Sequence, residues 1–457
     1  MGRRVSRGSK STAVSATPVK PGKTYPLSIL DHSMGLHTLR LVFYYKPMTT
    51  TSGPIDRERL KESLSDCLSH YPAVTGRLFR SEEGNWIVKC NDAGVRLMDA
   101  TVDATVDEWL ETVGGDEEVE RMTYWEDPLE DVSVWSPFYI QFNKFNDGGL
   151  AIGLSCPHMH VDPTCATLII KAWSDCHRLA PIIHPPFFHP PALIPRPNPN
   201  LSTASAAFYD SKSKHPNPLN NTTPPPMSTA TFRFSDASVK KLLSELTPHC
   251  PDATPFDALA ALFWTSVARA SGEEARARAL SVCIDFRKLM HAPLPHGFFG
   301  NALHFSRVSV ETEGEEGEGA GALARAAQAV RAHVSGLEEE EYWSAVEWLG
   351  TVRRDGKGRL MEPFAMYGGE ELTCASFDHM FSYGACFERD AKPAHVSYRV
   401  GGVGGEGMIM VLPSPEEGLG RTVTVTLPKD RTEAVRADKA VLRFEPTMVA
   451  SGRGFDV

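Results

Sequence analysis

The segment Ser155-Cys-Pro-His158-Met-His160-Val-Asp162-Pro163-Thr gathers residue types that could do chemistry. An apolar strand is expected to end at Ser155 and a helix to begin at Pro163, with Asp162 as its N-cap. His158 would then lie in a strand-to-helix loop, where a rigid scaffold presents side chains to a cleft. An imidazole in that place can act as a general base near neutral pH.

Other interpretations of this segment stay open at the sequence level. A single histidine can be a hydrogen-bonded core residue. His158, His160 and Asp162 alternate, so on an extended segment they could face one way as metal ligands. Cys156 could be a nucleophile with His158 as its base, although a cysteine at a strand end is usually buried and unreactive. No nucleophile elbow, Walker-type loop or dinucleotide-binding fingerprint occurs where its chemistry would need it.

Composition limits the class of protein. The chain has 457 residues, 42% hydrophobic and 23% charged, which is typical of a globular protein long enough for two cores. The net charge of −10 argues against non-specific nucleic-acid binding. Nine cysteines without a CxxC pair indicate a reducing, cytosol-facing environment. No apolar run approaches the ~20 residues of a membrane-spanning helix.

The first 23 residues carry six basic residues and no acid, and we expect them to form a basic flexible tail. Met1-Gly2 followed by Ser6 matches the N-myristoylation pattern. A lipid chain beside a basic cluster would be enough for peripheral membrane contact. A transit peptide is also compatible with this Ser- and Arg-rich composition.

Apolar periodicity predicts an alternation of strands and helices in both halves of the chain. In the first half, strands are expected at 41–45, 76–79, 86–90, 138–142 and 150–155, and helices at 56–71, 103–113 and 163–178. In the second half, strands are expected at 231–234, 280–284, 407–412 and 422–427, and helices at 235–246, 254–270 and 322–337, with a solvated loop at 311–321.

Residues 181–226 are rich in Pro, Asn and Ser, which predicts a long segment without regular structure. The predicted organisation is therefore a tail at 1–23, an N-terminal α/β domain at 24–180, a Pro-rich crossover linker at 181–228 and a C-terminal α/β domain at 229–457.

Several motifs occur in the order typical of one family. His158-Met-His-Val-Asp162 is an HxxxD motif, and the others are Leu27-Ser-Ile-Leu-Asp31, Tyr71-Pro-Ala-Val-Thr-Gly-Arg-Leu78, Phe256-Asp-Ala-Leu-Ala-Ala261 and Asp285-Phe-Arg287 followed by Gly297-Phe-Phe-Gly-Asn301. HxxxD alone is a weak signal, but the ordered set resembles the BAHD plant acyltransferases.

The resemblance implies an α/β fold of two chloramphenicol-acetyltransferase-like domains, each a mixed sheet flanked by helices, that enclose a channel open from both faces. It implies transfer of an acyl group from acyl-CoA, a co-substrate, to a hydroxyl or amine acceptor. His158 and Asp162 are the implied catalytic residues. Asp162 would hold its loop by pairing with Arg287, with Asp285 as further structural support. No metal, no permanently bound cofactor and no nucleic acid are implied, and we expect a monomer.

The family's DFGWG segment aligns with Met380-Phe381-Ser-Tyr383-Gly384, where only Phe381 and Gly384 match. This departure puts coenzyme A handling in question. Leu30-Asp-His-Ser-Met-Gly-Leu-His37 and the glycine-rich run from Gly401 to Pro413 resemble the Eceriferum/Glossy-type subgroup of wax biosynthesis. That resemblance implies a second function. The protein would then be a non-catalytic accessory protein of the very-long-chain fatty acid elongase. It would contact the condensing enzyme on the cytoplasmic surface of the endoplasmic reticulum.

Overall fold

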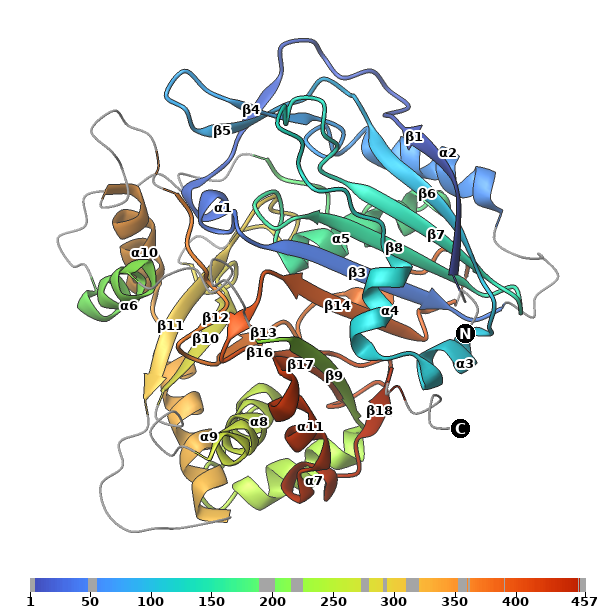
Figure 1. The fold of residues 1–457 in the computed structure, drawn as a ribbon. Helices are drawn as coiled ribbons and strands as arrows, with labels where there is room; N and C mark the ends of the chain where they lie inside the picture. Colours follow the sequence, from blue (N-terminus) through green and yellow to red (C-terminus); the bar gives the residue numbers. More distant parts are fainter. Residues whose placement is uncertain are drawn as a thin grey trace.

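Two large mixed β-sheets with flanking helices form the molecule (Figure 1). The computed structural model describes residues 5–47, 56–188, 202–214, 225–272, 279–290, 294–309, 320–351, 360, 362–389, 391–450 and 452. The architecture confirms the predicted α/β class. Within the described residues, no helix combines the length and the apolar character needed to cross a membrane.

The first sheet has six strands, and only the β6–β7 pair is parallel. Its order is β1 (Val5–Ala13), β6 (Val95–Val102), β7 (Tyr139–Phe145), β8 (Leu150–Pro157), β3 (Thr38–Tyr45) and β14 (His395–Gly401). A small three-stranded sheet lies beside it, in the order β2 (Thr24–Pro26), β5 (Trp86–Lys89) and β4 (Arg77–Arg80).

The second sheet has seven strands and is parallel at β10–β13–β16. Its order is β11 (Leu303–Ser309), β10 (Ala279–Asp285), β13 (Thr373–Ser376), β16 (Met408–Pro413), β17 (Arg421–Pro428), β9 (Met227–Phe234) and β18 (Thr447–Val449). A two-stranded parallel pair joins β12 (Gly368–Gly369) to β15 (Gly404–Gly405).

Helices cover both faces of the first sheet. Successive side chains along β3 point to opposite faces, and both faces are apolar. Phe43 packs in the cluster that contains α5 residues, whereas Val42 and Tyr44 pack against α3 and α4.

The helices are α1 (Ile29–Ser33), α2 (Arg57–Leu68), α3 (Val106–Thr112), α4 (Gly115–Met122), α5 (Pro163–His177), α6 (Thr203–Lys214), α7 (Asp236–Leu246), α8 (Pro255–Ser271), α9 (Ala320–Ser335), α10 (Glu339–Thr351), α11 (Lys429–Ala437) and α12 (Lys439–Leu442).

The expectation of a flexible tail is wrong for residues 5–13, which form β1 along β6. Their basic side chains bind within the fold: Arg7 donates to the Glu120 and Thr123 carbonyls, and Lys10 pairs with Glu126 at 2.7 Å. Backbone pairing with β6 at the sheet edge stabilises this segment, although its polar composition suggested disorder. The myristoylation pattern begins at residues 1–4, which lie outside the described residues.

Two expectations about the middle and end of the chain also need correction. Residues 203–214 of the predicted linker form α6, since the Pro-rich stretches lie on either side of a proline-free segment. β14 belongs by sequence to the predicted C-terminal domain, yet it pairs with β3 at the edge of the first sheet (Figure 1). The predicted loop at 311–321 falls largely outside the described residues.

Candidate active site

The His158 loop lies between β8 and α5, as the sequence predicts. Asp162 caps α5 by accepting from the Cys165 N–H at 2.8 Å, and Pro163 is the first helical residue. The His158 backbone donates to the His37 carbonyl at 2.9 Å and accepts from Asn301 Nδ2 at 2.9 Å. Contacts from both halves of the chain therefore fix this loop.

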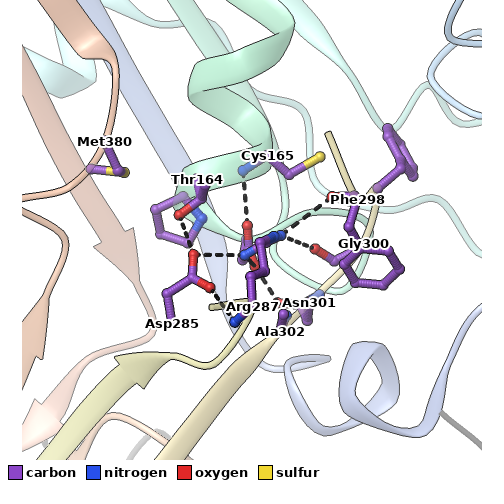
Figure 2. Close-up of polar contacts among 12 residues, drawn as sticks. Thr164, Cys165, Asp285, Arg287, Phe298, Gly300, Asn301, Ala302 and Met380 are labelled. Atoms are coloured by element: carbon purple, nitrogen blue, oxygen red, sulfur yellow. Dashed lines mark hydrogen bonds and ion pairs between the residues drawn. The ribbon is translucent and has the colours of Figure 1, made fainter. Parts of the chain in front are cut away.

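Arg287 bridges two buried carboxylates. Its Nη1 lies 2.8 Å from Asp162 Oδ2 and 2.7 Å from Asp285 Oδ2. Figure 2 shows its guanidinium also reaching the carbonyls of Phe298 and Gly300, at 3.3 and 3.2 Å. The Asp162–Arg287 pair that the family resemblance implies is therefore present. Asp162 is occupied by this pair, by the Cys165 N–H and by the Ala302 N–H at 3.0 Å.

Burial and charge act differently on the two carboxyl groups. Burial raises the pKa of Asp162 above its ordinary value, and Arg287 opposes that rise. Burial also acts on Asp285, but Arg287 and His379 outweigh it and hold the pKa of Asp285 below its ordinary range. Asp285 Oδ2 additionally accepts from Thr164 Oγ1 at 2.8 Å. The cluster therefore joins β10 to the first turn of α5.

The imidazole of His158 faces a tyrosine hydroxyl. Nε2 lies 3.0 Å from Tyr367 Oη, and both residues are 0% exposed. Burial lowers the pKa of His158 to about 4, so the ring is neutral near pH 7. The channel open from both faces that the family resemblance implies does not reach His158 in this conformation, because Tyr367 covers Nε2. Sequence reasoning missed Tyr367. The only local signal is the pair of glycines that follows it, Gly368 and Gly369.

A pocket opens elsewhere on the molecule. It is a half-open depression beside α1 and α10, and its lining includes His32, Leu349 and Phe364 but not His158.

The metal and cysteine interpretations find no support in the geometry. His160 packs its ring edge-on against Phe138 instead of joining His158, and Asp162 is engaged by Arg287. Within the described part of the chain, no group of three or more His, Cys, Asp or Glu side chains is arranged to hold a metal ion. Burial raises the pKa of the Cys156 thiol well above its ordinary value, which keeps it protonated and unreactive.

The segment that replaces DFGWG forms a short 3-10 turn, Ser382–Gly384, next to α5. Phe381 is 40% exposed and its ring lies against His184 and His296. Tyr383 is half-buried, and a Cβ on Gly384 would meet the Lys171 side chain at 3.2 Å. This segment therefore borders α5.

Comparisons with known proteins match nearly the whole chain. The family model described as "Transferase family" matches residues 4–441. "Protein ECERIFERUM 26-like" of Arabidopsis thaliana is 27% identical over 436 residues, 93% of each chain. "Hydroxycinnamoyltransferase 1" of Oryza sativa subsp. japonica is 26% identical over 412 residues, 88% of this chain and 91% of its own.

The fold is similar to that of a solved structure, vinorine synthase. The TM-score is 0.71 at 18% identity, covering 96% of this chain and 98% of the other. That similarity, together with the two mixed sheets, confirms the predicted chloramphenicol-acetyltransferase-like fold.

Proposed function

Because the chain belongs to the Transferase family, the BAHD acyltransferases, we propose that it moves an acyl group from a coenzyme A thioester to a hydroxyl or amine acceptor. His158 acts as the general base. Family membership and the named hydroxycinnamoyltransferase relative support acyl transfer. The observation that carries the role of His158 is the 3.0 Å contact between its Nε2 and a hydroxyl, that of Tyr367, which stands in for the acceptor hydroxyl.

The reaction follows from a neutral imidazole. Nε2 takes the acceptor proton as the acceptor oxygen or nitrogen attacks the thioester carbonyl. The tetrahedral intermediate then expels the coenzyme A thiolate, which takes the proton back from the imidazolium. General-base catalysis of this kind contributes roughly 10²–10⁴ in rate.

Asp162 and Arg287 act as positioning residues in this proposal. They contact each other and not the imidazole, and they hold the loop that presents it. Asp285 supports the same guanidinium from β10.

The test compares His158→Ala with His160→Ala as a matched control. Both histidines are fully buried in the same loop, but no hydrogen bond within the described residues reaches the His160 ring. Coenzyme A release from a panel of acyl-CoAs with alcohols and amines is measured for each purified variant. We expect His158→Ala to lower kcat by about 10²–10⁴ and His160→Ala to stay within about tenfold. Equal rates for both variants would refute the role of His158.

A second candidate is the accessory function in the very-long-chain fatty acid elongase. Two observations favour it: His158 is fully buried under Tyr367, and the DFGWG segment has diverged. The similarity to "Protein ECERIFERUM 26-like" fits the subgroup. In this form the protein contacts the condensing enzyme at the cytoplasmic surface of the endoplasmic reticulum.

One complementation experiment separates the two functions. His158→Ala and wild type are expressed in a host lacking its own copy, and wax chain lengths are profiled. Unchanged profiles with His158→Ala support the accessory role, and a profile like that of the empty host supports acyl transfer.

A further inference from the structure

We infer that Tyr367 is the residue that closes this site, and that its phenol occupies the place beside His158 Nε2 that an acceptor hydroxyl would need. The inference rests on the proposed role of His158 as the reacting group. The phenol oxygen lies 3.0 Å from His158 Nε2, within the distance at which a base accepts a proton from a bound hydroxyl. An acceptor and this side chain cannot occupy that place together.

Three aromatic rings lie against the Tyr367 ring, and the Cys283 thiol lies at its hydroxyl. The His37 ring lies edge-on at a centroid distance of 5.0 Å, and the Phe305 ring lies edge-on at 5.1 Å. The His158 ring is tilted by 33° at 5.7 Å. Such edge-to-face contacts favour a flat aromatic ring over an aliphatic chain of equal volume. Removing the side chain would therefore leave a cavity shaped for a para-substituted phenol with its hydroxyl toward His158.

The backbone on both sides of Tyr367 is held by side chains. The Met366 N–H donates to His37 Nε2 at 3.2 Å, and the Gly368 N–H donates to Thr373 Oγ1 at 3.0 Å. The buried Lys212, from α6, donates to the Gly368 carbonyl at 2.7 Å. These contacts come from three separate segments of the chain.

A glycine allows this tight path. Gly368 has φ 72°, and a Cβ there would lie 2.1 Å from the Gly404 carbonyl oxygen across the β12–β15 pair. The phenol is therefore a fixed part of the wall. The hydroxyl moves away from His158 Nε2 only if the Tyr367 side chain rotates or if the hydrogen bonds of Met366 and Gly368 break.

The test measures access to His158 without relying on activity. Wild type, Tyr367→Gly and the control Tyr45→Gly are treated with diethyl pyrocarbonate, and modification of the His158 peptide is followed by mass spectrometry. Tyr45 is a matched control because it is also a buried tyrosine, and its hydroxyl donates to the Ala385 carbonyl at 2.7 Å. We expect His158 in Tyr367→Gly to react at least about tenfold faster than in the other two proteins.

The probe for the cavity is p-cresol. It is expected to raise the melting temperature of Tyr367→Gly by several degrees, to leave that of the wild type unchanged, and to slow labelling of His158 in Tyr367→Gly. If Tyr367→Gly does not fold, Tyr367→Leu replaces it, since leucine keeps part of the buried volume but lacks the hydroxyl.

The outcomes separate this inference from the proposed function. Equal labelling of His158 in wild type and the Tyr367 variant, or a p-cresol shift in Tyr367→Gly without slower labelling of His158, overturns the closure. Faster labelling with no acyl-CoA turnover in any variant supports the closure and refutes acyl transfer. Faster labelling together with increased turnover supports both.

Discussion

At the scale of single residues, the site combines several buried groups whose charge states are set by burial. Burial lowers the pKa of His37 to about 3, of His158 to about 4 and of His160 to about 3. These rings differ in their partners: His37 binds Gly401 and Met366, His158 faces Tyr367, and His160 packs on Phe138. The neutral form of His158 is the one that a general base requires.

His160 should make the protein sensitive to acid. An unfolded histidine has a pKa near 6.5, so as the pH falls below that value the unfolded chain binds a proton that the folded chain refuses until about pH 3. Its stabilising contribution is therefore complete above pH 6.5 and is lost on acidification. At pH 5 the loss is about 2 kcal/mol.

We expect His160→Leu to lose about 2 kcal/mol less stability than wild type between pH 7 and pH 5, measured by urea unfolding. His70→Leu, at an exposed position, is the control. Equal losses in wild type and His160→Leu would contradict the prediction.

At the scale of elements, one guanidinium joins the two halves at the start of α5. Arg287 follows β10 and binds Asp162 at the α5 N-cap, and Thr164 of α5 binds Asp285 at the end of β10. The position of the His158 loop is therefore coupled to the second sheet. The Asp162 side chain is 0% exposed and the Asp285 side chain 6% exposed, so water compensates neither carboxylate well when the arginine is lost.

Replacing Arg287 by methionine should destabilise the fold by about 3–5 kcal/mol, because it leaves two buried carboxyl groups without their cation. Denaturant unfolding at pH 7 measures the effect. Arg421→Met is the control, since the Arg421–Asp378 pair at 2.9 Å is more exposed and should cost about 1 kcal/mol or less. A loss no larger than that of the control would mean that the buried cluster is not held by the guanidinium.

At the scale of the whole molecule, the first sheet takes one strand from the second half of the chain, and the two sheets share an apolar core. β14 completes the first sheet although it follows most of the second sheet in the chain. The main buried apolar cluster includes Phe43 and Trp173 of the first half and Phe286 and Met410 of the second. Because the halves pack in one apolar cluster, we expect them not to fold independently.

The full chain is accordingly expected to unfold in one transition, with coincident midpoints by circular dichroism and tryptophan fluorescence. Residues 1–228 expressed alone should aggregate, because the β3 edge and the apolar cluster lose their cover. Co-expression with residues 229–457 should restore a soluble complex. A fragment of residues 1–228 that unfolds cooperatively at the midpoint of the full chain would contradict this expectation.

The sequence by itself determined the local elements and the family. Apolar periodicity located β8 and α5, and the Asp-Pro pair located the helix start, because N-caps and strand alternation depend on neighbouring residues only. The HxxxD motif identified His158, and the family resemblance implied the Asp162–Arg287 pair.

Tertiary structure alone decided what these residues face. Tyr367 lies 209 positions from His158, and no local pattern could predict that its hydroxyl would meet Nε2. The same holds for β14 on the edge of the first sheet and for β1, whose polar composition suggested disorder. Pairing and burial between distant segments are collective properties of the packed chain, which is why they overrode local composition at these places.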